Sequence, residues 1–309
     1  MKKTPKTFYE YLNPDFGYFY TYTGVIAEKK TKFQNLKLVN TKEFGKVLLL
    51  DGITQVGEKN EFLYHEPMTH LNLLGIDNPQ NILVIGGGDG GIVREVLRHS
   101  AVRRIDHVDI DGDVFVFSKK YLPTVAGSAF TSKKTIQIAA DGRAWVREHP
   151  GLYDGVIMDM TDPFGPSRML YTKEFFAMVK KSFRNPAKGM FTMHSESPIS
   201  RPNTFVDILA TLKKSFKYVT PYYIYIQMYA VLWSIAVCSD NPIMSKISAD
   251  EVEKRLKQRR IKNLEVINGE TVRAMRAEFP YIQKLRKQKG KVISDTDPDV
   301  RDIIIKFSK

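Results

Sequence analysis

The stretch Ile82-Leu-Val-Ile-Gly-Gly-Gly-Asp-Gly-Gly-Ile-Val-Arg-Glu-Val-Leu97 decides the fold, together with the run His107-Val-Asp-Ile-Asp111. An apolar segment of strand length ends in five glycines interrupted by Asp89, a helical pattern follows, and a second apolar strand ends at Asp109. This order is typical of a nucleotide-binding βαβ unit. Its glycines let the backbone approach the ligand, and the acid of the second strand meets a ribose diol.

Asp89 is the point at which this turn departs from a dinucleotide site. A carboxylate at the N-terminus of a helix repels a pyrophosphate, so we expect a nucleoside that lacks phosphate and carries a positive charge. The alternative is a glycine-rich turn in an ordinary α/β protein. The acids that follow both strands favour the nucleoside site.

From residue 80 onward, predicted strands and helices alternate along the chain. Alternation of this kind predicts an α/β fold, and we expect a Rossmann-like, methyltransferase-type, mainly parallel sheet with helices on both faces. The expected strands are Ile82–Ile85, Arg104–Asp109, Ile136–Ala139, Gly155–Met158, Gly189–Met193, Tyr218–Tyr225 and Leu232–Cys238. The expected helices cover residues 90–98, 112–121, 142–148, 173–184, 202–216 and 248–259.

Aromatic and β-branched segments near the N-terminus, with a turn signal at Asp51-Gly52, predict a small antiparallel β domain before this sheet. Pro67 suits a first helical turn, so the polar residues just before it are expected in a loop that faces the glycine turn. The expected domains are an N-terminal β-strand domain at 1–66, a Rossmann-like catalytic domain at 67–285 and a basic C-terminal tail at 286–309.

The composition is that of a soluble protein, since 43% of the 309 residues are hydrophobic and no apolar stretch reaches the roughly 18 residues that span a bilayer. We expect no secretory signal. The single cysteine, Cys238, fits a reducing cytoplasm and is expected to be a buried small hydrophobe. The net charge of +13 is compatible with nucleic-acid binding, but the late clusters of Lys and Arg favour solvated helix faces.

Acidic residues follow four successive predicted strands: Asp89, Asp109, Asp141 and Asp159. In open α/β sheets, ligands bind beyond the carboxyl ends of the strands, so these acids are expected to share one edge of the sheet. A row of acids at that edge is hard to ascribe to chance.

Two further acidic elements extend this edge. Asp159 and Asp162 lie in a loop stiffened by two prolines, and the fifth strand is followed by Ser195-Glu196-Ser197-Pro198. Paired acids without a nearby His or Cys are a weak metal signal, so we expect no metal. Acids combined with the aromatic rings of Tyr64 and Tyr229 suit a polycation, which gains charge pairing and cation–π contact.

These motifs together resemble the polyamine aminopropyltransferase (spermidine synthase) family, over roughly Gln34 to Pro242. The matching stretches are Leu50–Gln55, Glu61–Glu66, Gly86–Gly91 with Arg94-Glu95, Asp141-Gly142, Asp159–Pro166 and Ser195–Pro198. The resemblance implies transfer of the aminopropyl group of decarboxylated S-adenosylmethionine to a diamine, usually putrescine, which gives spermidine and releases 5′-methylthioadenosine. It also implies a homodimer or homotetramer, with no prosthetic group.

The resemblance implies a role for each matching residue. Asp159 would be the catalytic proton acceptor. The residues that would hold the nucleoside co-substrate are Gln34, His65, Asp89, Asp109, Asp141, Gly142 and Pro166, with Asp109 on the ribose and His65 and Asp89 at the aminopropyl end. The residues that would place the acceptor amine are Tyr64, Asp162, Glu196 and Tyr229.

Several positions depart from the family pattern. Asp109 replaces the usual Glu, Asn60 replaces a common Asp, and His194 replaces a common Gln. The loop that usually reads Pro-Thr-Tyr-Pro-Ser-Gly is here Gln227-Met-Tyr-Ala-Val231, one residue shorter. Because that loop borders the acceptor pocket, agmatine, cadaverine or spermidine remain open as acceptors beside putrescine.

Two other functions stay open at this point. A methyltransferase would use ordinary S-adenosylmethionine, but its carboxylate would be repelled by Asp89. A basic nucleic-acid-binding protein is the second alternative, and it would bind RNA or DNA with steep salt dependence.

Overall fold

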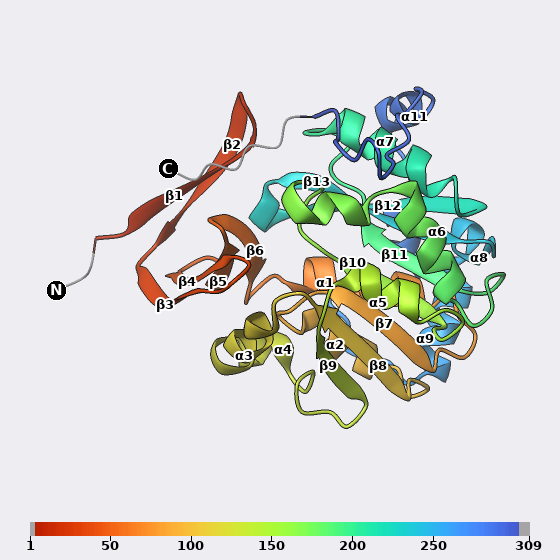
Figure 1. Ribbon diagram of the computed structural model, residues 1–309, viewed down its shortest axis with the longest axis horizontal. Helices are drawn as coiled ribbons and strands as arrows, with labels where there is room; N and C mark the ends of the chain where they lie inside the picture. Colours follow the sequence, from red (N-terminus) through yellow and green to blue (C-terminus); the bar gives the residue numbers. More distant parts are fainter. Residues whose placement is uncertain (1–3, 303–309) are drawn as a thin grey trace.

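The computed structural model describes residues 4–302, and its chain begins with two small antiparallel sheets (Figure 1). One is a hairpin and the other a four-stranded meander in chain order. The strands are β1 (Lys6–Asn13) and β2 (Phe16–Tyr22) in the hairpin, then β3 (Gly24–Lys30), β4 (Asn35–Thr41), β5 (Gly45–Leu50) and β6 (Ile53–Gly57) in the meander. This region confirms the predicted N-terminal antiparallel β-structure.

A seven-stranded sheet forms the centre of the molecule, with strand order β12-β13-β11-β10-β7-β8-β9. The strands are β7 (Asn81–Gly86), β8 (Arg104–Asp109), β9 (Thr135–Ala139), β10 (Gly155–Asp159), β11 (Met190–His194), β12 (Tyr218–Ile226) and β13 (Val231–Ser239). Strands β7 to β11 pair in parallel, and β13 pairs antiparallel with both of its neighbours. The predicted mainly parallel sheet is confirmed.

Helices cover both faces of this sheet, because its central strands are apolar on both sides. The helices that pack with one face are α1 (Phe62–Leu73), α2 (Gly91–Leu97), α9 (Ala249–Gln258) and α10 (Gly269–Met275). Those on the other are α5 (Gly142–Glu148), α6 (Lys173–Ser182), α7 (Pro202–Leu212) and α11 (Pro280–Arg286). The two hydrophobic clusters draw on alternate residues of β7, since Ile82 and Val84 belong to one and Leu83 and Ile85 to the other.

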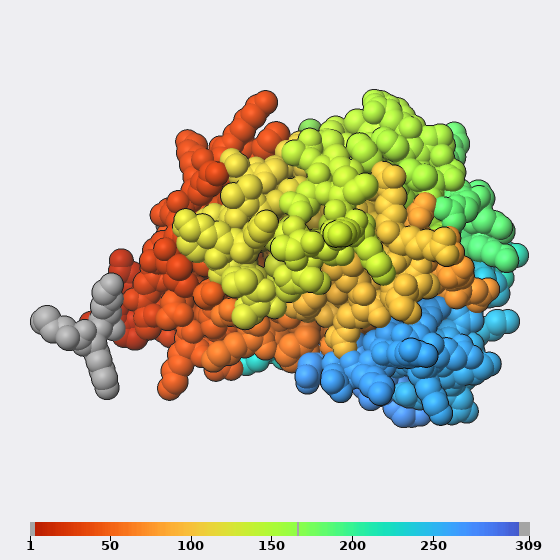
Figure 2. Space-filling view, turned by 90° about the horizontal axis from the view of Figure 1, so that it is seen from below, coloured from red at the N-terminus to blue at the C-terminus, as the bar shows by residue number. Residues whose placement is uncertain are grey.

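The remaining elements of the described chain are three helices and two 3₁₀ turns. They are α3 (Gly112–Tyr121), α4 (Pro123–Ala126), α8 (Ile243–Lys246) and the 3₁₀ turns η1 (Gly165–Leu170) and η2 (Gln227–Tyr229). Val114 and Phe117 of α3 pack on Leu36 and Leu38 of β4. This yellow segment lies against the red and orange N-terminal strands in Figure 2. This contact joins the four-stranded meander to the seven-stranded sheet beside the glycine turn.

Helix α1 corrects one expectation. Residues before Pro67 were expected in a loop, but the helix begins at Phe62 and Pro67 lies in its interior. A proline there lacks the N–H of one helical hydrogen bond, which costs about 3 kcal/mol in an isolated helix. Burial of every residue from Tyr64 to Leu73 outweighs that cost, so tertiary packing overrides the local signal.

Further expectations concern Cys238, the C-terminal tail and membrane spans. Cys238 is a fully buried free thiol, as predicted. The tail expected at 286–309 is anchored by Ile293, which is fully buried and whose N–H donates to the Thr211 hydroxyl; residues 303–309 lie outside the described part. Over residues 4–302, helices of the length and apolarity required to cross a membrane are absent. The domain limits at 66 and 285 stay a prediction.

Leu71 tests the packing of α1. This side chain is fully buried, so Leu71→Ala should lower the free energy of unfolding by about 2–5 kcal/mol. The exposed Val116 of α3 provides the control, and Val116→Ala should change stability by less than about 0.5 kcal/mol. Urea denaturation of both variants measures the difference. Equal effects of the two substitutions would contradict the packing described.

Candidate active site

The glycine turn after β7 packs directly against the end of β10. The Gly87 N–H donates to the Asp159 carbonyl at 2.8 Å, and a Cβ atom at Gly86 would lie 2.1 Å from that same oxygen. Gly86 and Gly87 also have φ values of +76° and +64°, which other residues rarely adopt. The glycines are therefore required for the approach of the turn to Asp159.

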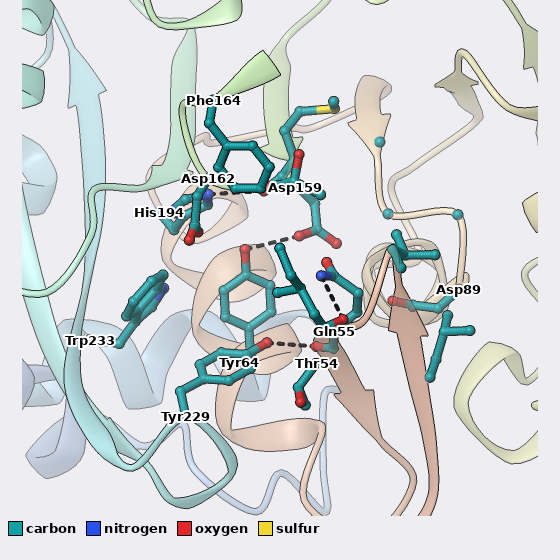
Figure 3. Close-up of a pocket in the computed structure, with 18 of the residues that line it drawn as sticks. Thr54, Gln55, Tyr64, Asp89, Asp159, Asp162, Phe164, His194, Tyr229 and Trp233 are labelled. Carbon is teal, nitrogen blue, oxygen red and sulfur yellow. Dashed lines mark hydrogen bonds between the residues drawn. The ribbon is translucent and has the colours of Figure 1, made fainter. Parts of the chain in front are cut away.

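A cavity opens at this edge of the sheet, and five carboxyl groups line it: Glu10, Asp89, Asp109, Asp159 and Asp162. Its other walls come from the β5–β6 region of the meander and from aromatic side chains (Figure 3). The main ones are Leu48, Leu50, Ile53, Thr54, Gln55, Tyr64, Phe164, His194, Tyr229 and Trp233. An acidic, aromatic cavity in a chain of net charge +13 is suited to a cationic small molecule.

His65 holds Asp89, the acid of the glycine turn, in place. Its Nδ1 lies 2.5 Å from Glu61, and its Nε2 lies 3.6 Å from Asp89. Arg94 donates two hydrogen bonds to the same Glu61 carboxylate. Burial alone would lower the pKa of His65, but Asp89 and Glu61 raise it well above its usual value, so the ring is an imidazolium at neutral pH.

Asp159 lies at the centre of the cavity. The Tyr64 hydroxyl donates to its carboxylate at 2.9 Å (Figure 3). Burial, followed by the charge of Asp89, raises the pKa of Asp159 to about 7. Burial and two neighbouring aspartates raise the pKa of Asp109 to about 6. These carboxyl groups crowd negative charge that a bound cation would relieve.

The aromatic side chains gather beside Asp159. Tyr64 and Tyr229 meet edge to face with ring centroids 6.4 Å apart, and the Tyr229 hydroxyl donates to the Gln55 carbonyl at 2.7 Å. Trp233 stacks on His194 at 5.4 Å. In Figure 3 these rings and Phe164 surround the space next to Asp159 and Asp162. This half of the cavity therefore offers aromatic faces to a cation.

The predicted site residues divide into two groups. The side chains that line the cavity are Tyr64, His65, Asp89, Asp109, Asp159, Asp162 and Tyr229. Those that do not line it are Gln34, Asp141, Gly142 and Glu196. The side chain of Pro166, in η1, lies outside the described part of the chain.

Three residues of the second group have other contacts. The Gln34 amide donates to Asp111, whose own N–H donates to Asp109. Asp141 caps helix α5 by accepting from the Arg143 N–H. Glu196 is fully buried and pairs with Arg201.

Two charged lining residues were missed by sequence reasoning. Glu10 comes from β1 and Arg201 from the turn before α7. Arg201 contacts both Asp162 and Glu196, and its position three residues after Pro198 was the available signal. Glu10 had no such signal, because only the fold brings β1 to this cavity.

The cavity also contains groups that resemble metal ligands. Ligand atoms of His65, Asp89 and Asp159 lie within 4.8 Å of one another, as do those of Asp162, His194 and Glu196. A metal-bound histidine must be neutral, whereas Asp89 and Glu61 keep His65 protonated. In the second group Arg201 already pairs with both acids. These donors therefore suit an organic cation better than a metal, and the absence of a metal stays a prediction.

The fold and the cavity define a class: an α/β protein of the nucleoside-binding type, with an acidic pocket for cations at the carboxyl edge of its sheet. Family models match most of the chain, the spermine/spermidine synthase domain at residues 61–248 and the spermidine synthase tetramerisation domain at residues 7–58. The chain belongs to the spermine/spermidine synthase family.

Known proteins resemble the chain over nearly its whole length. It is 34% identical to the polyamine aminopropyltransferase of Nitrosomonas europaea, over 93% of this chain and 87% of that one. It superposes on the crystal structure of spermidine synthase from Thermotoga maritima with a TM-score of 0.83 and 28% identity, over 93% and 97% of the two chains. A spermidine synthase in complex with the transition state analogue AdoDATO gives a TM-score of 0.85 at 28% identity, with the same coverage.

The burial of Asp159 and its closeness to Asp89 predict the pH at which Asp159 titrates. In the ligand-free protein, carboxyl NMR should show Asp159 ionising near pH 7, uncharged below that pH and charged above it. Asp89→Asn removes a neighbouring negative charge, so the pKa of Asp159 should fall. The control is Asp113, which is half-buried, pairs with Lys29 and lies outside the residues lining the cavity, and Asp113→Asn should leave the titration unchanged. A midpoint below pH 5 in the unmodified protein would contradict the arrangement described.

Proposed function

We propose that the protein transfers the aminopropyl group of decarboxylated S-adenosylmethionine to a polyamine acceptor, with putrescine as the favoured acceptor and spermidine as the product. The observation that carries this proposal is the position of Asp159, between the glycine turn and the aromatic half of the cavity. Membership of the spermine/spermidine synthase family supports the same reaction. The reaction needs no prosthetic group, because the sulfonium is itself the activating group.

In this reaction the acceptor nitrogen attacks the aminopropyl carbon next to sulfur. The carbon–nitrogen bond forms as the carbon–sulfur bond breaks, and the electron pair stays on sulfur in 5′-methylthioadenosine. The nitrogen loses a proton, which Asp159 accepts. In the empty protein the pKa of Asp159 is raised to about 7, and the charge of the bound sulfonium lowers it, so Asp159 is ionised and able to accept the proton when the co-substrate is present.

The attacking amine must be uncharged, although free alkylamines have a pKa of about 10. The neighbouring sulfonium and the buried position both lower that pKa in the complex. Tyr64 orients Asp159 through its hydroxyl, and Tyr229 provides an aromatic face beside it. The protein thus supplies position and a proton acceptor.

The nucleoside side of the cavity takes the co-substrate. Asp109 would bind the ribose hydroxyls at the end of β8, and Asp89 with His65 would receive the aminopropyl end. Gln34 would act through its bond to Asp111. We assign the adenine to the loops at Asp141, Gly142 and Pro166, which follow β9 and β10.

We also propose a homodimer or homotetramer that assembles through the N-terminal hairpin. Tyr9, Tyr11, Phe16 and Phe19 of that hairpin are each more than two-fifths exposed, a large apolar surface for a monomer. The match of residues 7–58 to a tetramerisation domain supports this assignment. The cytoplasmic location expected from the single cysteine stays a prediction.

Asp159→Asn tests the catalytic assignment. Loss of the proton acceptor should lower kcat for methylthioadenosine release by about 10²–10⁴-fold. Asp113, which lies outside the residues lining the cavity, again provides the control, and Asp113→Asn should retain full activity. Near-normal turnover by Asp159→Asn would refute the role of this carboxylate.

Asp89→Asn tests how the co-substrate is selected. The unmodified protein should bind decarboxylated S-adenosylmethionine more tightly than ordinary S-adenosylmethionine, because Asp89 repels the extra carboxylate. The substitution should reduce this preference by about tenfold, or 1.4 kcal/mol. Calorimetry with both nucleosides measures the ratio. An unchanged ratio would remove Asp89 from the selection.

A further inference from the structure

Arg201 occupies the part of the cavity that borders Asp162. Its guanidinium side chain is 6% exposed, and its Nη1 lies 2.5 Å from Asp162 and 3.0 Å from Glu196. Its Nε donates to the Leu12 carbonyl of β1. One cation is therefore held between two carboxylates, next to the space that an acceptor would enter.

The charges in this cluster nearly cancel. Burial alone would raise the pKa of Asp162, but Arg201 lowers it below its usual value, so this group is ionised. Burial raises the pKa of Glu196 to about 8, despite Arg201 and with a contribution from Asp162, so this group is protonated at neutral pH. One ionised carboxyl, one guanidinium and one neutral carboxyl leave no net charge.

This neutrality matters for a diamine acceptor. A second ammonium group gains by pairing with an ionised carboxylate that lacks a cation, but Asp162 already pairs with Arg201 and Glu196 is uncharged. Glu10 also lines the cavity, where it accepts from the Thr54 N–H, and burial raises its pKa. Trp233 and Tyr229 contribute aromatic rather than charged surface. Arg201 thus weakens the preference of the cavity for an acceptor that carries a second ammonium group.

We propose that Arg201 is a specificity-determining residue, whose guanidinium occupies the position in which the second ammonium of a diamine would pair with Asp162 and Glu196. The acceptor is then selected by its attacking amine and by aromatic contact, and linear alkylamines with an uncharged far end belong to the substrate class. This inference rests on the proposed aminopropyl transfer, because it concerns the acceptor half of that site.

The test compares putrescine with n-butylamine, which has the same carbon chain but a single amine. Dissociation constants are measured by calorimetry with the protein saturated in methylthioadenosine, and kcat/KM is measured with decarboxylated S-adenosylmethionine. Arg201→Met should increase the preference for putrescine over butylamine at least tenfold in both measurements, by freeing the carboxylates. An unchanged or smaller preference would overturn the proposal.

Two further variants complete the test. Arg201→Met leaves buried acids without a cation, so Arg201→Met/Glu196→Gln removes one acid as well, and the same increase is expected because Asp162 is freed. If both variants bind methylthioadenosine normally but show no increase, Arg201 does not determine specificity. Arg184, which pairs with Asp154 and lies outside the residues lining the cavity, provides the control, and Arg184→Met should leave the preference unchanged.

Failure of the proposed aminopropyl transfer can be distinguished from failure of the role of Arg201. If the unmodified protein releases no methylthioadenosine with any amine, the proposed function is wrong, and the proposal for Arg201 as a determinant of acceptor use falls with it. If release is normal with putrescine but the preference does not respond to Arg201, only the specificity inference is wrong.

Discussion

The contact between the glycine turn and the end of β10 is the constraint on which the rest of the site depends. The Gly87 N–H donates to the Asp159 carbonyl, and a Cβ atom at Gly86 would collide with that carbonyl oxygen. Burial raises the pKa of Asp159, and this approach brings Asp89, which follows β7, close enough to raise it further. Crowding of like charges is unfavourable in the empty protein, and a cationic ligand relieves it. The fold thus creates its own selectivity for cations.

A buried network behind the cavity keeps these acids in place. His65 connects Asp89 to Glu61, Glu61 is paired with Arg94, and all of these groups lie on helices α1 and α2 or at their starts. Because α1 packs against several strands of the central sheet, the positions of Tyr64 and His65 are determined by the hydrophobic core and not by a loop. The same packing allows α1 to tolerate Pro67 in its interior.

Much of this arrangement could be predicted from the sequence, and the failures have physical causes. The alternating apolar segments predicted the sheet, and the acids after β7, β8 and β10 were expected at one edge because parallel strands share that edge. Asp141 could not be distinguished from them, although its carboxylate caps α5. Glu10 reaches the cavity through tertiary contacts between distant segments, which no local pattern encodes, whereas the position of Arg201 shortly after Pro198 was a signal that the sequence offered. The start of α1 was predicted too late in the chain, because the prediction relied on the local effect of Pro67, which burial of the helix outweighs.

The central claim is that the carbon chain next to the sulfonium moves to the nitrogen of an amine. The most direct measurement uses decarboxylated S-adenosylmethionine labelled with ¹³C in the aminopropyl group, with putrescine as acceptor and mass spectrometry of both products. The account predicts labelled spermidine and unlabelled methylthioadenosine in equal amounts. Methylated putrescine, or a labelled aminopropyl alcohol formed by water with no labelled amine product, would contradict it.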